Sequence, residues 1–241
     1  MTVACAPSDC GVMNGRPRVQ GGRIWGEMAA DGQGRALRPR AGTMATMTAA
    51  EFWDAEAGNF DEQPDHGLGD PTVRAAWAGL LLPLMPPSPA RVVDLGCGTG
   101  SLSLLMAEVG HRVSGLDISP AMVALAQEKL AGAGYEAEFS VGDAAAPPWR
   151  PGSFDVVLTR HVLWAMADPD AALTAWIDLL APEGRLVLVE GRWWTGAGMT
   201  AAQVSDLVLR DRVEAEVTAL DDAVLWGEPI RDERFVVVSR Q

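Results

Sequence analysis

The residues with the clearest chemical potential form the segment 92–100, with the sequence VVDLGCGTG. Apolar residues precede its three glycines and a helical run follows them, so the segment predicts a tight turn from a strand into a helix. A ligand can lie against the bare backbone of such a turn. The turn that binds NAD has a further glycine three positions after Gly98, where this chain has Ser101, so NAD is disfavoured.

Acidic residues follow the next two apolar runs along the chain. Asp117 ends the run 111–117, seventeen residues after Gly100, and Asp143 follows Gly142 after a third run. Because the carboxyl ends of parallel strands meet at one edge of a sheet, these acids should lie beside the glycine turn. A carboxylate at this position can accept hydrogen bonds from both hydroxyls of a ribose. The pattern therefore predicts a site for a nucleoside cofactor.

An acid just before the glycines, followed in order by Asp117 and Asp143, resembles the cofactor motifs of class I S-adenosylmethionine-dependent methyltransferases over roughly residues 72–190. The resemblance implies S-adenosyl-L-methionine as the cofactor and S-adenosyl-L-homocysteine as the product. It implies that Asp94 lies near the methionine ammonium, that Asp117 binds the ribose and that Asp143 takes the adenine amino group. The other residues implied to contact the cofactor are Gly96, Cys97, Gly98, Gly100, Ile118, Ala144 and Arg160.

Each of these acids also has a purely structural interpretation. Asp94 could order the turn by accepting backbone N–H groups, Asp117 could precede a helix cap, and Asp143 could belong to an ordinary Gly-Asp turn. Cys97 could act as a nucleophile only with a base beside it, and no adjacent residue supplies one. The agreement of several motifs in order and spacing favours cofactor binding for the three acids.

Two histidines are candidates for the base that accepts a proton from the methylated atom. His161 follows the apolar run 154–160, at the edge where the cofactor should bind, and the reference pKa of histidine suits proton transfer near neutral pH. His66 lies in the acidic loop FDEQPDHGLGD, which should fold near the acceptor. The alternatives are that His161 packs within a wall and that His66 is a surface residue.

Three tryptophans and one arginine are candidates for binding the acceptor. Trp164, Trp193 and Trp194 follow the fourth and fifth apolar runs, where they could form a wall for a flat or apolar molecule or pack beneath loops. Arg160 could anchor an acceptor carboxylate or form an ion pair with a loop acid. The acidic loop around His66 favours a basic or amine-bearing acceptor through charge complementarity.

Apolar runs alternate with helical ones after residue 48. This alternation predicts an α/β fold, with a Rossmann-like, doubly wound sheet of seven strands that is mainly parallel and ends in an antiparallel pair. The last two predicted strands have only about six residues between them, too few for a crossover helix, so they should be antiparallel neighbours. The predicted strands span 91–95, 111–117, 137–143, 154–160, 184–191, 223–227 and 234–240, and the predicted helices span 49–60, 71–84, 101–110, 118–134, 168–184 and 200–220.

The first 46 residues differ in composition from the rest of the chain. They contain eight glycines and carry a net charge of +3, from six arginines and three acids, without a helical or strand period. We predict that residues 1–46 are disordered, or that they are an extension from a start codon assigned too early, with Met47 as the more natural start. The alternative is that this segment forms a lid over the site. Residues 47–241 are predicted to form one methyltransferase domain, in which 47–90 help to build the acceptor pocket.

Charge and composition exclude several classes of partner. A formal net charge of -13 disfavours nucleic acid, and no apolar run resembles a signal peptide or a membrane span, which predicts a cytoplasmic protein. Cys5, Cys10 and Cys97 show no zinc spacing, and no metal is expected. The oligomeric state stays open between monomer and homodimer.

These features favour transfer of a methyl group to an oxygen or nitrogen of a small acceptor by in-line displacement, with a specialised metabolite of natural product biosynthesis as one candidate. A protein methyltransferase on the same fold is the second hypothesis. A regulator that binds the cofactor without turnover is the third, and an NAD oxidoreductase comes last.

Overall fold

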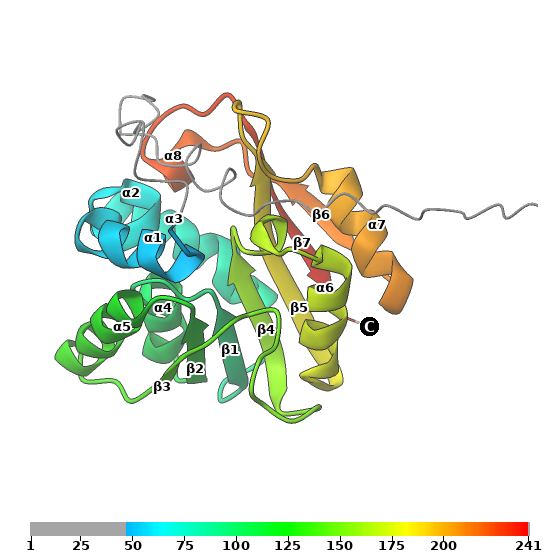
Figure 1. Cartoon of the computed structure of the whole chain (residues 1–241), viewed down its shortest axis with the longest axis horizontal. Coiled ribbons are helices and arrows are strands. Elements are labelled where there is room, and N and C mark those ends of the chain that lie inside the picture. Colours follow the sequence, from blue (N-terminus) through cyan, green and yellow to red (C-terminus); the bar gives the residue numbers. More distant parts are fainter. Residues whose placement is uncertain (1–46, 241) are drawn as a thin grey trace, which may run out of the picture.

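Apolar side chains cover both faces of the central strands, so the sheet needs helices on both sides. The computed structural model describes residues 47–240, which form a seven-stranded sheet in the order β3-β2-β1-β4-β5-β7-β6 (Figure 1). The strands β1 to β5 are parallel, and β7 lies antiparallel between β5 and β6. Their bounds are β1 (Arg91–Leu95), β2 (Arg112–Asp117), β3 (Glu138–Val141), β4 (Phe154–Arg160), β5 (Leu180–Arg192), β6 (Glu216–Ala219) and β7 (Glu233–Ser239). The predicted α/β fold, mainly parallel with an antiparallel end, is confirmed.

The helices form two apolar cores with the sheet. Helices α3, α4, α5 and α8 contribute to one core, and α6 and α7 contribute to the other. Successive residues of a strand point to opposite cores, as Val92 and Val93 do in β1. The helices are α1 (Ala49–Glu56), α2 (Pro64–Gly67), α3 (Pro71–Leu81), α4 (Ser101–Glu108), α5 (Pro120–Gly132), α6 (Pro169–Asp178), α7 (Ala201–Asp211) and α8 (Ala223–Trp226), with the 3-10 turns η4 (Ala57–Glu62), η5 (Leu82–Leu84) and η6 (Leu163–Ala165).

Side-chain caps fix where the helices near the site begin. Thr48 and Glu51 form a capping box at the start of α1. The Ser119 hydroxyl accepts the Met122 N–H at 3.1 Å, and Pro120 occupies the first position of α5. Helix α5 therefore begins directly after β2, at the carboxyl edge of the sheet.

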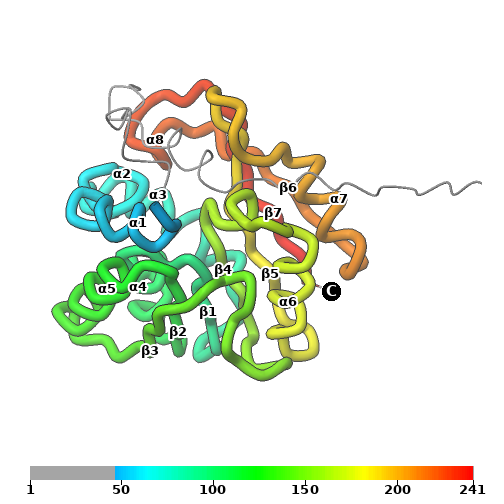
Figure 2. Tube along the Cα trace, viewed as in Figure 1, coloured from blue at the N-terminus to red at the C-terminus, as the bar shows by residue number. Residues whose placement is uncertain are grey.

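The N-terminal helices lie over one end of the parallel strands. In Figure 1 the arrowhead of β4 points toward the end of the sheet where α1, α2 and α3 gather, and Figure 2 shows the same grouping along the Cα trace. Open α/β sheets bind their ligands at the carboxyl ends of the strands. These helices therefore cover the edge at which the sequence places the cofactor.

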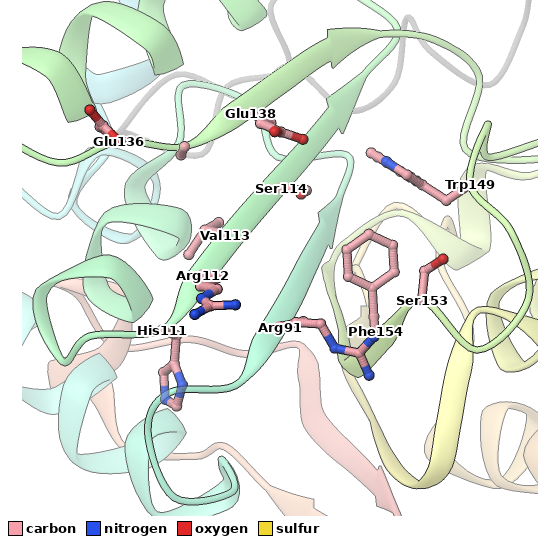
Figure 3. A pocket seen from close by; sticks show the side chains of 11 residues that line it. Arg91, His111, Arg112, Val113, Ser114, Glu136, Glu138, Trp149, Ser153 and Phe154 are labelled. Carbon is pink, nitrogen blue, oxygen red and sulfur yellow. The ribbon is translucent and has the colours of Figure 1, made fainter.

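An open hollow of about 480 Å³ lies at the opposite edge of the sheet (Figure 3). Its lining includes the first residues of four strands, Arg91, Arg112, Glu138 and Phe154. The described chain has no helix between β3 and β4, which leaves this part of the sheet without a crossover helix over it. Because the hollow borders the amino ends of parallel strands, it is not the place where the glycine turn would hold a ligand.

The C-terminal segment differs from its prediction. Residues 223–227 were wrongly predicted as a strand, and they form the short helix α8. The Asp222 carboxylate caps this helix by accepting the Val224 N–H at 3.0 Å, and Gly227, with a φ of 73°, ends it. The strand that pairs with β7 is β6, which lies inside the predicted helix 200–220. The antiparallel pair is present, but its first strand comes earlier in the chain than predicted.

Two further helices are shorter than predicted. The helix predicted for 168–184 ends at Asp178, because β5 already begins at Leu180 and pairs there with Phe154. The helix predicted for 49–60 continues as the 3-10 turn η4 after α1. The predictions for 1–46 and for the final residue fall outside the described residues. No helix within the described range has the length and apolar character needed to cross a membrane.

Candidate cofactor and acceptor site

The glycine turn follows β1 and leads the chain into α4. Gly96, Gly98 and Gly100 have φ values of 69°, 53° and 78°, in the left-handed region where glycine carries no steric penalty. The N–H groups of Gly96 and Cys97 donate to the Leu116 carbonyl of β2 at 2.7 and 3.0 Å. The turn is thereby held against β2, and its glycines present backbone without side chains at the carboxyl edge of the sheet.

Asp117 ends β2 beside this turn. Its carboxylate accepts the Gly98 N–H and the Ser119 N–H, both at 2.9 Å, and the half-buried Ile118 connects it to the cap of α5. Burial raises the pKa of Asp117 above its ordinary value, although the backbone N–H donors lower it. Each carboxylate oxygen has a further lone pair, so the side chain can still accept the hydroxyls of a ribose.

Asp94, in β1, lies deeper in the protein. It is 2% exposed and accepts the Ser103 hydroxyl of α4 at 2.7 Å. Burial raises its pKa to about 6, against the effects of this hydrogen bond and of Arg160. The side chain joins β1 to α4, which supports the structural interpretation, and its contact with a methionine ammonium stays a prediction.

The remaining residues of the predicted cofactor set have different environments. Burial, together with two neighbouring aspartates, raises the pKa of the Cys97 thiol well above its ordinary value, which makes it unsuitable as a nucleophile. Asp143 accepts the Ala145 N–H at 2.8 Å within a local turn. The backbone carbonyl of Ala144 accepts the indole N–H of Trp176 at 2.7 Å. The turn after β3 is thus fixed by hydrogen bonds beside the end of β2.

These residues fit an adenosyl cofactor. Bare backbone stands where β1 ends, and carboxylate oxygens stand where the adjacent β2 ends. A Cβ on Gly98 would lie 3.2 Å from the Phe60 ring, so a side chain there would fill the space between the turn and the N-terminal helices. Within residues 47–240, no group of three ligand-type side chains lies close enough together to hold a metal ion.

Residues 49–67, which we call the N-terminal cap, are attached to this edge through carboxylates. Asp54 of α1 accepts the Ser119 hydroxyl at 2.5 Å and the Ala121 N–H at 3.0 Å. These hydrogen bonds lower the pKa of Asp54, so an ionised carboxylate faces the positive end of α5. The cap is therefore docked on the helix that directly follows the predicted ribose-binding residue.

Lys129 of α5, the one lysine of the chain, makes a second attachment. Its ammonium lies 2.8 Å from the Asp61 carboxylate of η4 and donates to the hydroxyls of Thr99 and Ser101 at 2.9 and 2.8 Å. A compact ammonium can meet three oxygens at once, whereas a planar guanidinium has a fixed fork. A lone lysine among arginines forms no motif, so sequence analysis did not select Lys129.

Replacement of Lys129 by methionine should loosen the N-terminal cap without unfolding the sheet. Loss of this partly exposed attachment should reduce the free energy of local opening by about 1 kcal/mol, so amide exchange in 49–67 should accelerate roughly fivefold. Hydrogen exchange followed by mass spectrometry measures this change. Arg150→Met, at an exposed arginine, is the control and should leave the cap unchanged. Equal exchange in Lys129→Met and wild type would show that the attachment does not hold the cap.

Arg160 ends β4 and points into the N-terminal cap. Its guanidinium donates to the carbonyl oxygens of Asp65 and His66 and lies 5.2 Å from the centroid of the Trp77 ring. No carboxylate of the described residues forms an ion pair with it, and its contact with an acceptor carboxylate stays a prediction. The side chain holds the cap through backbone carbonyls, and a contact with the cofactor stays a prediction.

Three of the predicted acceptor residues meet in space. The ring centroid of Trp193 lies 5.2 Å from that of His161 and 5.2 Å from that of Trp164. His161 has a left-handed backbone with a φ of 60°, which is uncommon outside glycine and indicates a constrained position. A Cβ on Gly96 would collide with Val162, so the loop that carries His161 contacts the glycine turn. The candidate acceptor residues therefore lie beside the candidate cofactor residues.

The His161 side chain is neutral and incompletely hydrogen-bonded. Burial lowers its pKa well below the ordinary value, and the nearby Arg234, Arg160 and His66 lower it further. Its Nδ1 atom is buried and has no hydrogen-bond partner among the described residues. This differs from the expectation that the ordinary histidine pKa applies here, because the lowered pKa makes the ring a weaker base. Its unused ring nitrogen can still accept a hydrogen bond from an acceptor hydroxyl.

Trp226 and Arg234 complete this group, and sequence analysis missed both. The Trp226 ring of α8 stacks near His161, with 6.0 Å between the centroids. The Arg234 guanidinium of β7 lies 4.9 Å from the Trp193 centroid and 5.3 Å from the Trp226 centroid. Trp226 belongs to the segment whose secondary structure was predicted wrongly. The arginine at the start of the apolar run RFVVVS was a signal that could have indicated Arg234.

His66 and Trp194 lie in different surroundings from this group. His66 stacks on Phe60 with 4.3 Å between ring centroids, and its ring lies 3.6 Å from the Asp65 carboxylate. Burial lowers the pKa of His66, against the effect of Asp65. Trp194 is 64% exposed, and its backbone N–H donates to Asp232 at 2.7 Å. The roles of both residues toward an acceptor stay predictions.

Glu190 of β5 supports the loop that carries His161. It is fully buried, and one carboxyl oxygen accepts the N–H groups of Val162 and Leu163 at 3.0 and 2.7 Å. Burial raises its pKa to about 8, so the carboxyl group is mainly protonated at neutral pH. No sequence motif marked this residue. An acid at the end of an apolar strand usually lies where the strand reaches solvent, so the sequence did not indicate that Glu190 is buried.

Residues 93–188 match the family model described as a methyltransferase domain. This segment runs from β1 into β5 and includes the glycine turn, Asp117 and His161.

Curated relatives share part of this region. A ubiquinone biosynthesis O-methyltransferase of Xanthomonas euvesicatoria is 36% identical over 143 residues, which cover 58% of this chain and 56% of the relative. A demethylmenaquinone methyltransferase of Thermus thermophilus is 40% identical over 105 residues, which cover 43% of this chain and 48% of the relative. The chain thus spans about half the length of the curated relatives it matches.

Solved structures share the fold. A SAM-dependent methyltransferase from Aquifex aeolicus has a TM-score of 0.59 at 17% identity, covering 77% of this chain and 97% of that one. The [4+2]-cyclase SpnF has a TM-score of 0.61 at 20% identity, covering 69% of this chain and 80% of that one. Because one of these proteins is named for a cyclisation, the fold alone does not define the reaction.

The sheet order, the glycine turn and the acid at the end of β2 define a nucleoside-binding domain of the doubly wound type. With the matched family model, they make residues 93–188 a methyltransferase domain similar to those of the class I S-adenosylmethionine-dependent methyltransferases. The cofactor of this family is S-adenosyl-L-methionine, as the resemblance implied.

Proposed function

We propose that this protein transfers a methyl group from S-adenosyl-L-methionine to an oxygen atom of a small, planar acceptor. The observation that carries this proposal is the contact between the glycine turn and the loop bearing His161, which brings a neutral base and several tryptophans to the cofactor edge. Relatives named as O-methyltransferases support oxygen over nitrogen. A specialised metabolite is one acceptor of this kind.

Bound S-adenosyl-L-methionine supplies a methyl group that is already activated by its sulfonium. The chain itself must orient the acceptor, exclude water and accept a proton. The indoles of Trp164 and Trp193 form an apolar wall beside His161, against which the edge of a planar ring can pack. Nδ1 of His161 accepts the proton of the acceptor hydroxyl as the oxygen is methylated. The N-terminal cap, held by Arg160, shields this site from solvent.

A label-transfer experiment tests the proposal. Purified protein is incubated with a donor labelled in its methyl group and with a cell extract, and mass spectrometry follows the label in small molecules and in proteins. Label in a small molecule supports the proposal and gives the mass of the acceptor. Label confined to proteins would instead identify a protein methyltransferase. Tight binding of S-adenosyl-L-homocysteine without any labelled product would favour a binding protein without turnover.

His161→Asn should reduce kcat by about 100-fold or more, because loss of a general base typically costs at least this factor. Asparagine tolerates the left-handed backbone at this position, so the loop should keep its conformation. The affinity for S-adenosyl-L-homocysteine, measured by calorimetry, should remain within about twofold of the wild-type value. An unchanged kcat with the acceptor identified above would contradict the role of His161 as the base.

A further inference from the structure

The tryptophans beside His161 already enclose a cation. The guanidinium carbon of Arg234 lies 4.9 Å from the Trp193 centroid and 5.3 Å from the Trp226 centroid. Aromatic cages bind ammonium ligands through these same ring faces. Because Arg234 occupies the faces of both indoles, this wall does not offer them to a cationic acceptor.

Arg234 has hydrogen-bonding capacity that the described chain does not use. The residue is 9% exposed, and one terminal nitrogen pairs with the Asp232 carboxylate at 2.9 Å. Its Nε and Nη1 atoms are buried and have no hydrogen-bond partner in residues 47–240. Buried N–H donors of a cation without acceptors are costly, so they indicate a place for an oxygen of a ligand.

The backbone provides the space for this arginine at Gly191. Gly191 of β5 pairs with Arg234 of β7, and a Cβ on Gly191 would lie 2.8 Å from Cδ and 3.1 Å from Nη1 of the arginine. A larger residue at this position would displace the guanidinium. The close approach of the two strands therefore positions Arg234 between the indoles.

Two of the acids that favoured a basic acceptor in the sequence have partners away from His161. Asp61 pairs with Lys129 at 2.8 Å, and Asp70 caps α3. The Asp65 carboxylate lies 3.6 Å from the His66 ring, and it raises the pKa of Arg234 less than Asp232 does. The two oxygens of Asp232 are engaged by Arg234 and by the Trp194 N–H. The acidic composition of this loop therefore does not describe the charge that an acceptor meets beside His161.

We propose, building on the methyl-transfer function above, that Arg234 selects an acceptor with an anionic oxygen, a carboxylate or phenolate, next to the hydroxyl to be methylated. The anion lies against Nε and Nη1 of Arg234, and the hydroxyl faces Nδ1 of His161. Arg234 is thus a specificity-determining residue, and the favoured acceptor is anionic and not basic.

The test compares the binding of three ring compounds of similar shape to the protein saturated with S-adenosyl-L-homocysteine. The compounds are salicylate, salicylamide and 2-hydroxybenzylamine. Calorimetry gives each dissociation constant. Salicylate should bind at least about tenfold more tightly than salicylamide, and the amine should bind most weakly, because charge-assisted hydrogen bonds are about twice as strong as neutral ones. In Arg234→Met the preference for salicylate over salicylamide should fall to within about threefold.

Two further variants separate charge from folding. Arg234→Lys keeps the charge and should keep part of the preference for salicylate, whereas Arg231→Met, at an exposed arginine, should keep all of it. Equal binding of salicylate and salicylamide, tighter binding of the amine, or an unchanged preference in Arg234→Met would overturn the proposal. Each of these results leaves label transfer to a small molecule intact, whereas failure of the proposed function would abolish that transfer.

Discussion

Asp117→Ala should weaken the binding of S-adenosyl-L-homocysteine by about 100-fold or more. Two hydrogen bonds from ribose hydroxyls to a carboxylate contribute about 1.5–3 kcal/mol each, and each 1.4 kcal/mol corresponds to a factor of ten. The same change leaves the N–H groups of Gly98 and Ser119 without their acceptor, which disturbs the turn itself. Calorimetric titration at a temperature where the variant remains folded measures the effect.

Asp155→Ala is a matched control for this loss. Asp155 also accepts a backbone N–H, from Arg91 at 2.8 Å, but it lies near the amino end of β4, at the opposite edge of the sheet. Its removal should lower stability and leave the affinity for S-adenosyl-L-homocysteine unchanged. An equal loss of affinity in both variants would point to general destabilisation, and full affinity in Asp117→Ala would exclude the ribose role.

Glu190→Gln should remove most of a pH-dependent loss of stability. The pKa of the Glu190 carboxyl is raised from 4.5 to about 8 in the folded protein, so the unfolded chain releases this proton first as the pH rises. The free energy of unfolding of the wild type should therefore fall between about pH 4.5 and pH 8, by about 5 kcal/mol from this group. A glutamine oxygen can still accept the Val162 and Leu163 N–H groups, and the amide does not ionise in this range.

Urea unfolding followed by tryptophan fluorescence, at several pH values across this window, measures the prediction. The stability of Glu190→Gln relative to wild type should increase with pH, because contributions from other buried acids, such as Asp94, are common to both proteins and cancel. Glu138→Gln, at an exposed glutamate of the same sheet, is the control for loss of a carboxylate. Parallel stability curves for Glu190→Gln and wild type would show that Glu190 is not buried as a neutral acid.

The cofactor half of the fold was predictable because its signals are local. The turn at 94–100 joins an apolar strand to a helix, and Ser119 with Pro120 marks the start of the next helix. Such patterns need no knowledge of distant residues. Strand and helix extents up to 160 accordingly agree with the structure to within a few residues, apart from the helix predicted for 49–60.

The C-terminal half was less predictable because tertiary pairing decides it. Residues 216–219 are exposed along their whole length, and they form a strand because β7 offers its edge to them. The grouping of His161 with Trp193 could be expected, since both follow parallel strands. Trp226 and Arg234 lie beside His161 because β7 is placed between β5 and β6. No local pattern in the sequence predicts this placement.

The division of the site between β1–β4 and the flanking segments affects how such a protein can diverge. The donor-binding turn and His161 lie within 93–188, whereas Trp193, Trp226 and Arg234 follow that segment and the N-terminal cap precedes it. If the proposed roles hold, substitutions in the flanks after a gene duplication change which molecule is recognised while the inherited donor-binding part stays intact. Proteins that descend from such a duplication can acquire new acceptors without an intermediate that no longer binds the methyl donor.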